Sequence, residues 1–200
     1  GTTSKRGGKV LKKNKTYKIQ IQYKFEGNFP AIYIGCQPPD KIDLMEEALN
    51  IAKEVEQVVL MVGTNSDWET EGNDRVDFNL PGKQNELIEK VLEINPNTIV
   101  VLNTGSPINM PWINKAKAVI QSWYAGQEYG NALVDVLTGA TNPSGKLPTT
   151  FPANLSDTPA FESYPGKNLQ MDYDEKLLVG YKWYDKNAIE PLFPFGHGLS

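Results

Sequence analysis

The sequence predicts an α/β fold in which a mostly parallel sheet is sandwiched between helices. Two short, continuous apolar runs, 58–62 and 98–103, are rich in β-branched residues, as is typical of strands buried on both faces. Segments with apolar residues at helical spacing precede and separate these runs. Strands that alternate with helices along a chain indicate βαβ units and therefore a parallel sheet.

The elements of this fold are expected within residues 39–200. Asp40 is a suitable N-cap for the first helix, and Asn95-Pro96 ends the second. Beyond Thr141 the chain is rich in Pro, Gly and aromatic residues and should wrap the sheet with few regular elements. The predicted elements are a helix over 41–54, a strand over 58–62, a helix around 87–92, strands over 98–103 and 118–121, a helix over 128–137 and a strand near 178–184.

A β-hairpin is expected earlier in the chain, over residues 18–34. Apolar and polar side chains alternate strictly along its first half, which is the pattern of a half-buried antiparallel strand. A turn at 27–28 precedes a second apolar run at 31–34. Because two strands alone are only marginally stable in water, this hairpin requires a sheet that residues 1–38 do not supply.

Charge is unevenly distributed along the 200 residues, whose net charge is −4. Residues 1–30 contain eight Lys or Arg and one Glu, whereas the remainder contains twelve Lys or Arg and twenty-three Asp or Glu. An acidic body of this size argues against a nucleic-acid partner. No apolar run approaches the roughly 20 residues that cross a membrane, so no membrane partner is expected. No signal-peptide layout is present, and the location of the protein stays open.

The scarcity of metal-binding residue types limits the chemistry. Cys36 is the single cysteine and His197 the single histidine, which excludes an internal disulfide and a Cys/His metal cluster. Neither a dinucleotide-binding nor a phosphate-binding glycine pattern occurs. A Gly-x-Ser-x-Gly nucleophile elbow is also absent from the sequence. We therefore expect no metal and no cofactor.

The segment 65–75 is the strongest candidate for a functional site. It directly follows the apolar run 58–62, and open α/β sheets bind their ligands beyond the carboxyl ends of their strands. Crowded carboxylates cannot all ionise comfortably beside an apolar indole, so one of them can keep a proton for general-acid catalysis. Arg75 is the expected counter-charge of Asp74. The alternative, that these charges only order a surface loop, remains open. The acidic residues of the segment are Asp67, Glu69, Glu71 and Asp74, and its indole is Trp68.

Several motifs, in one order over about residues 55–200, resemble the C-terminal sandwich domain of glycoside hydrolase family 3. Within the family, the greatest likeness is to β-glucosidases. The hairpin at 18–34 looks like the tail of a β-sandwich insert that resembles the anthrax protective antigen module. The motifs are Trp68-Glu69-Thr70-Glu71-Gly72-Asn73-Asp74-Arg75, Leu80-Pro81-Gly82, Gln84, Asn103-Thr104-Gly105-Ser106-Pro107, Pro111-Trp112, Trp123-Tyr124, Gly126-Gln127-Glu128, Asn142-Pro143-Ser144-Gly145-Lys146-Leu147-Pro148 and Phe193-Pro194-Phe195-Gly196-His197-Gly198-Leu199-Ser200.

The resemblance implies a division of the catalytic groups between two domains. It implies hydrolysis of terminal β-linked glucose from a β-glucoside or cello-oligosaccharide, with retention of configuration. The family's acid/base Glu, in a Glu-Gly pair shortly before Asp-Arg, corresponds to Glu71, with Glu69 as the second choice. Asp74 and Arg75 correspond to a pair that anchors the loop, and Trp68 is a candidate substrate contact. The nucleophilic Asp belongs to an N-terminal barrel domain that this chain lacks.

The resemblance also implies that the chain is an internal fragment of a larger enzyme. Residues 1–38 would be the remnant of the β-rich insert with its linker, and 39–200 the sandwich domain. Half of the catalytic pair would be absent, so the fragment alone is expected to be inactive. The alternative is a non-catalytic carbohydrate-binding or docking module that keeps the sandwich without the chemistry.

Overall fold

The computed structural model describes residues 11, 12, 14–20, 22, 24, 43–72, 74, 75 and 77–200. By its internal contacts the chain divides into two units, 1–41 and 42–200, which are considered separately. The hairpin expected at 18–34 lies mostly outside the described residues and remains a prediction, as does a domain boundary after residue 38. The fold that positions the candidate site belongs entirely to the second unit.

A three-stranded parallel sheet forms the centre of the second unit, which confirms the predicted fold class. Its strands are β1 (Val58–Gly63), β2 (Thr98–Asn103) and β3 (Ala118–Gln121), in the order β1-β2-β3. Gly63 pairs with Asn103, and Leu102 pairs with Gln121, so all three strands end at one edge of the sheet. The middle strand is the most buried, as its continuous apolar run predicts.

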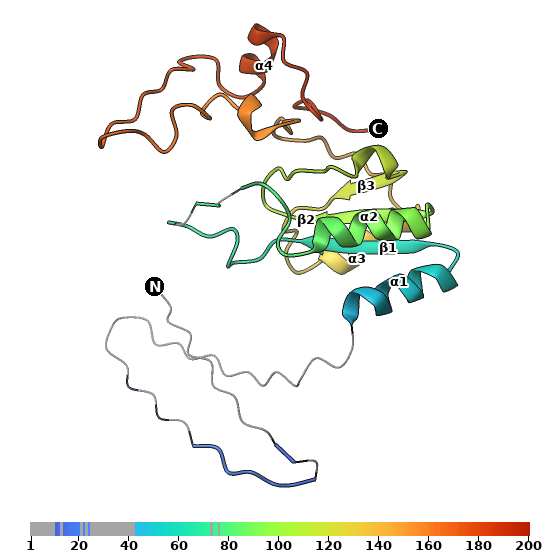
Figure 1. Ribbon diagram of the computed structural model, residues 1–200. Helices are drawn as coiled ribbons and strands as arrows, with labels where there is room; N and C mark the ends of the chain where they lie inside the picture. The colour runs from blue at the N-terminus through green and yellow to red at the C-terminus, as the bar shows by residue number, and fades with distance from the viewer. Residues whose placement is uncertain are drawn as a thin grey trace. The chain divides into compact units, whose positions relative to one another are not determined.

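Helices cover both faces of this sheet. Helix α2 (Gln84–Ile94) lies on one face and buries Ile88, Val91 and Leu92, while α3 (Tyr129–Leu137) lies on the other (Figure 1). Helix α1 (Leu44–Glu54) packs against α2. It begins three residues later than expected, because Asp43 is its N-cap. The Asp43 carboxylate accepts hydrogen bonds from the backbone N–H groups of the first turn, at 3.0 and 3.3 Å.

Two aromatic residues connect the later part of the chain to the core beneath the sheet. Trp112 is fully buried just before the 3₁₀ turn η1 (Ile113–Lys115), and its indole N–H donates to Asn85 of α2 at 3.0 Å. Phe151 is equally buried, and it exchanges two backbone hydrogen bonds with Phe193. Phe151 also belongs to the core cluster that contains Val100 and Leu102 of β2, so the chain beyond 141 packs against the sheet there, as the sequence predicts for a wrapping segment.

The strand predicted near 178–184 is wrong. This region forms the short helix α4 (Tyr181–Asn187), which begins after Gly180 and ends at Ala188. Both flanking residues have positive φ angles, 60° and 52°, which turn the chain sharply at each end. Only Tyr184 of the helix is buried. The aromatic and β-branched composition favours a strand locally, but the fold buries one face of a helical turn there instead.

Asn95 provides a test of how α1 is attached to the sheet. Its buried amide donates to the carbonyl oxygens of Ala52 and Val55, at 3.0 and 2.9 Å, at the end of α1. Asn95→Ala leaves both carbonyls without this partner, so we expect a loss of about 1–3 kcal/mol in the free energy of unfolding. Urea unfolding followed by circular dichroism measures it.

The matched control is Asn131→Ala, which removes an exposed side-chain hydrogen bond to Glu128 on α3. This variant should change the free energy of unfolding by less than about 0.5 kcal/mol. Equal effects of the two substitutions would contradict the structural role assigned to Asn95.

Candidate functional site

The candidate site begins at the carboxyl end of β1, where a side chain from α2 fixes the strand. The amide of Gln84 forms two hydrogen bonds with the backbone of Gly63. The Gly63 N–H donates to Oε1 at 2.8 Å, and Nε2 donates to the Gly63 carbonyl at 2.9 Å. Nε2 also donates to the carbonyl of Pro81 at 3.1 Å. Gln84 thus takes the place of a neighbouring strand, and the acidic loop leaves the sheet from a fixed point.

Glu69 is the most highly connected side chain of this loop. Its side chain is only 14% exposed, and five donor groups lie within hydrogen-bond distance of its two oxygens. Arg75 belongs to the acidic loop itself, and the other four groups come from the segments that directly follow the three strands. Oε1 accepts from Thr64 Oγ1 at 3.0 Å, Ser106 Oγ at 3.1 Å and Arg75 Nη1 at 3.3 Å, and Oε2 accepts from the Gly105 N–H at 2.9 Å and Tyr124 OH at 3.1 Å.

Arg75 also differs from the sequence expectation in its partner. The carboxylate with which it forms an ion pair is that of Glu69, whereas the sequence suggested Asp74. Nη2 of Arg75 donates to the carbonyl of Pro107 at 3.1 Å. Arg75 therefore links the acidic loop to the loop that follows β2.

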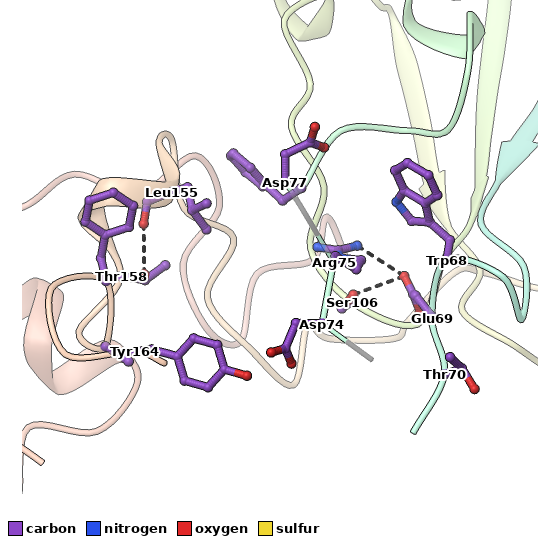
Figure 2. A pocket seen from close by; sticks show the side chains of 13 residues that line it. Trp68, Glu69, Thr70, Asp74, Arg75, Asp77, Ser106, Leu155, Thr158 and Tyr164 are labelled. Carbon is purple, nitrogen blue, oxygen red and sulfur yellow. Dashed lines mark hydrogen bonds and ion pairs between the residues drawn. The ribbon is translucent and has the colours of Figure 1, made fainter. Parts of the chain in front are cut away.

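Asp74 faces Tyr164, in a distant segment of the chain (Figure 2). Hydrogen bonding to the Asp74 carboxylate raises the pKa of the Tyr164 hydroxyl, and desolvation and the negative charge of Asp74 act in the same direction. The cause is physical: an ionised phenol would lose its proton to donate and would stand beside a second negative charge.

Glu71 has a very different environment from Glu69. It lies in an exposed turn that continues through Gly72, whose φ of 79° suits glycine. Among the residues that the structure describes, none forms a hydrogen bond or ion pair with the Glu71 side chain. Its carboxylate is therefore open to solvent or to a partner from outside the described chain.

A cleft of about 590 Å³ lies beside the acidic loop. One wall comes from residues 68–70, 74, 75, 77 and 78, and the opposite wall from 155–164 (Figure 2). Trp68 lies in the cleft wall, and its buried indole N–H has no hydrogen-bond partner among the described residues. The aromatic lining on the far side comes from Phe161 and Tyr164. The cleft thus combines apolar rings with carboxylates, as ligand pockets do.

Within the described ranges, no group of three or more His, Cys, Asp or Glu side chains is arranged to hold a metal ion. No helix in the same ranges has the length and apolar character needed to cross a membrane.

Comparison with known proteins identifies the family. The family model of the glycosyl hydrolase family 3 C-terminal domain matches residues 4–200. The chain belongs to glycosyl hydrolase family 3. A probable β-glucosidase I from Emericella nidulans is 41% identical over 216 aligned positions, which cover 100% of this chain and 25% of that protein. A β-glucosidase from Rhizobium radiobacter is 46% identical over 193 positions, or 92% of this chain and 24% of that protein.

Solved structures of β-glucosidases have the same fold. A β-glucosidase from Kluyveromyces marxianus in complex with glucose superimposes with a TM-score of 0.76 and 43% identity, over 78% of this chain and 19% of that one. A β-glucosidase from Streptomyces venezuelae in complex with D-glucose gives 0.74 and 46%, over 78% and 20%. The chain spans about a quarter of the length of the curated relatives it matches.

The structure brings together most of the residues that the sequence indicated. Trp68, Glu69, Asp74 and Arg75 line one cleft, and Glu71 lies on the exposed turn between them. The sequence did not indicate that residues from other loops bind Glu69. The signal that could have found them is their position, since each lies within three residues of a strand end. These residues are Thr64, Gly105, Ser106 and Tyr124.

The contact between Tyr164 and Asp74 predicts a measurable titration. Subtracting the absorbance titration of Tyr164→Phe from that of the unchanged chain isolates the Tyr164 hydroxyl. Its midpoint should lie above about pH 10, the ordinary value for tyrosine. Asp74→Asn should lower this midpoint, because the hydrogen-bonded negative charge is removed. A Tyr164 midpoint at or below the ordinary value, or one unchanged in Asp74→Asn, would contradict the contact.

Proposed function

We propose that this chain supplies the acid/base carboxylate of a retaining β-glucosidase, and that this carboxylate is Glu71. The observation that carries the assignment is the contrast between the two glutamates of the loop. Glu71 is exposed and without a partner among the described residues, whereas Glu69 is held by five donors. A residue that gives and takes a proton needs a free oxygen within reach of the substrate.

The occupied environment of Glu69 makes it the weaker candidate. The Glu69 oxygens accept hydrogen bonds from the Arg75 guanidinium and the Gly105 backbone N–H. Both of these groups can donate hydrogen bonds but cannot accept them. The same bonds also fix both oxygens toward the protein, so they offer little access to a glycosidic oxygen.

The reaction requires a second carboxylate. Retaining glycosidases hold two carboxyl groups about 5–5.5 Å apart. The nucleophile attacks the anomeric carbon while Glu71 gives its proton to the departing glycosidic oxygen. Glu71 then takes a proton from water as that water attacks the same carbon, which releases the nucleophile and restores the acid.

The nucleophile is proposed to be an Asp in an N-terminal barrel domain of the complete enzyme. The chain covers only about a quarter of its relatives, which leaves room for such a domain. The substrates proposed are β-glucosides and cello-oligosaccharides with a terminal glucose, by similarity to relatives named β-glucosidases. Trp68, in the wall of the cleft, is proposed to contact the substrate. Asp74 and Arg75 are proposed to anchor the loop, through Tyr164 and Glu69 respectively.

Glu71→Ala in the complete enzyme tests the acid role. Cleavage of an alkyl glucoside should fall by roughly 10²–10⁴-fold, because its poor leaving group needs protonation. Cleavage of an aryl glucoside with an acidic phenol should fall much less in the first, glycosylation step. Steady-state and pre-steady-state rates on both substrates measure the difference. Equal losses in the glycosylation step would contradict the assignment.

The chain alone tests the division of the catalytic pair. Purified residues 1–200 should not hydrolyse glucosides, because the proposed nucleophile is absent. Stoichiometric turnover by the purified chain would contradict the proposal. Calorimetric titration with glucose or a glucoside addresses the alternative, a carbohydrate-binding module, which the aromatic cleft favours. Saturable binding by the chain, together with full activity of Glu71→Ala in the complete enzyme, would support that alternative.

A further inference from the structure

We propose that Glu69 is a positioning residue, whose carboxylate clamps the ends of the three strands together and thereby fixes the loop that carries Glu71. This inference rests on the proposed function of Glu71. It assigns Glu69 a role that requires the negative charge and both oxygens of its side chain, but no contact with the substrate.

The groups that donate hydrogen bonds to Glu69 come from three separate loops. Thr64 directly follows β1, and Arg75 lies at the end of the same acidic loop. Gly105 and the adjacent Ser106 belong to the loop after β2, and Tyr124 to the segment after β3. One carboxylate therefore joins three loops that are far apart in the sequence.

The Glu69 carboxylate and its charged partner Arg75 are largely buried. The side chains of Glu69 and Arg75 are 14% and 19% exposed, and they lie 3.3 Å apart. Hydrogen bonds to an ionised group are the stronger ones, and donors left without an acceptor in a part-buried site are unfavourable. The Glu69 contacts therefore restrain the loop more strongly than exposed ion pairs do, such as that between Glu93 and Lys115.

Each oxygen of the Glu69 carboxylate faces a group that can only donate a hydrogen bond. Oε1 faces the guanidinium of Arg75, and Oε2 faces the backbone N–H of Gly105. Neither group can accept a hydrogen bond. A glutamine at position 69 would place its NH₂ against one of them in either orientation of the amide. The site thus distinguishes a carboxylate from an amide of the same shape.

The loop after β2 passes close to the Glu69 carboxylate at Gly105. A Cβ at Gly105 would collide with Oε2 of Glu69 and with the ring of Tyr124. Glycine is required at position 105 because a side chain there would occupy the space of the Glu69 carboxylate and the Tyr124 ring. Gly105→Ala therefore perturbs the same contacts from a different strand, without changing any charge.

The position of Glu69 also restricts the position of Glu71. Glu71 is two residues from Glu69, and two residues of chain extend at most about 7 Å. Fixing Glu69 therefore limits the positions that the Glu71 backbone can reach. Since a misplacement of about 1 Å in a catalytic group can reduce the rate by about 10²-fold, a loosened clamp should impair proton transfer.

The experiment uses the complete enzyme with Glu69→Gln, Gly105→Ala and the double variant, and Glu93→Gln as the control. We expect kcat/KM for an alkyl glucoside to fall by about 10²-fold in each single variant, and less for an activated aryl glucoside. The double variant should lose little more than the worse single variant, because both act on one set of contacts. Glu93→Gln, an exposed site on α2, should leave both rates unchanged.

The ratio of the two rates separates positioning from a general loss of structure. A smaller folded fraction lowers both rates equally and leaves the ratio unchanged, so an unchanged ratio in both Glu69→Gln and Gly105→Ala overturns the clamp. If Glu69→Gln fails to fold, the ratio of the alkyl to the aryl glucoside rate in Gly105→Ala alone tests the positioning role of Glu69. An unchanged ratio in Glu71→Ala would instead overturn the proposed function, and with it this inference. A changed ratio in Glu71→Ala but not in the clamp variants overturns the clamp alone.

Discussion

The hydrogen bonds of the Glu69 carboxylate are the interaction on which the candidate site depends. A parallel sheet brings the carboxyl ends of its strands to one edge, but its ladder of backbone hydrogen bonds does not continue through the loops beyond that edge. Glu69 supplies a common acceptor for donors from all three loops. Gln84 performs a related task one step earlier, by pairing with the last residue of β1. The sheet edge is thus ordered by side chains rather than by a further strand.

The two glutamates of this short loop have contrasting environments. The oxygens of Glu69 are occupied and turned into the protein, whereas Glu71 stands in an exposed turn. We interpret this contrast as a division of labour between a group that holds the loop and a group that carries out the chemistry. The four acids whose crowding suggested catalysis in the sequence have separate environments in the structure. Glu69 is paired with Arg75, Asp74 lies near Tyr164, and Asp67 and Glu71 lie in exposed turns.

Most of the fold could be predicted from the sequence because its signals are local. The apolar runs of β1 and β2 and the helical spacing of Ile88, Val91 and Leu92 each lie within a few residues. Helix α4 could not be predicted, because its short aromatic segment also fits a strand and tertiary packing decides between them. The contacts of Glu69 could not be predicted for a related reason. Its contact with Tyr124 joins residues 55 positions apart, and no spacing along the chain reveals it.

The most direct test of this division of labour is rescue by azide in the complete enzyme. A small anion can replace a carboxylate that touched the reacting atoms, but not one that held a loop in place. With an activated aryl glucoside, azide should accelerate Glu71→Ala and yield β-glucosyl azide, and it should have no effect on Glu69→Ala. Rescue of Glu69→Ala with none of Glu71→Ala would contradict the account, because it would place Glu69 at the reacting bond.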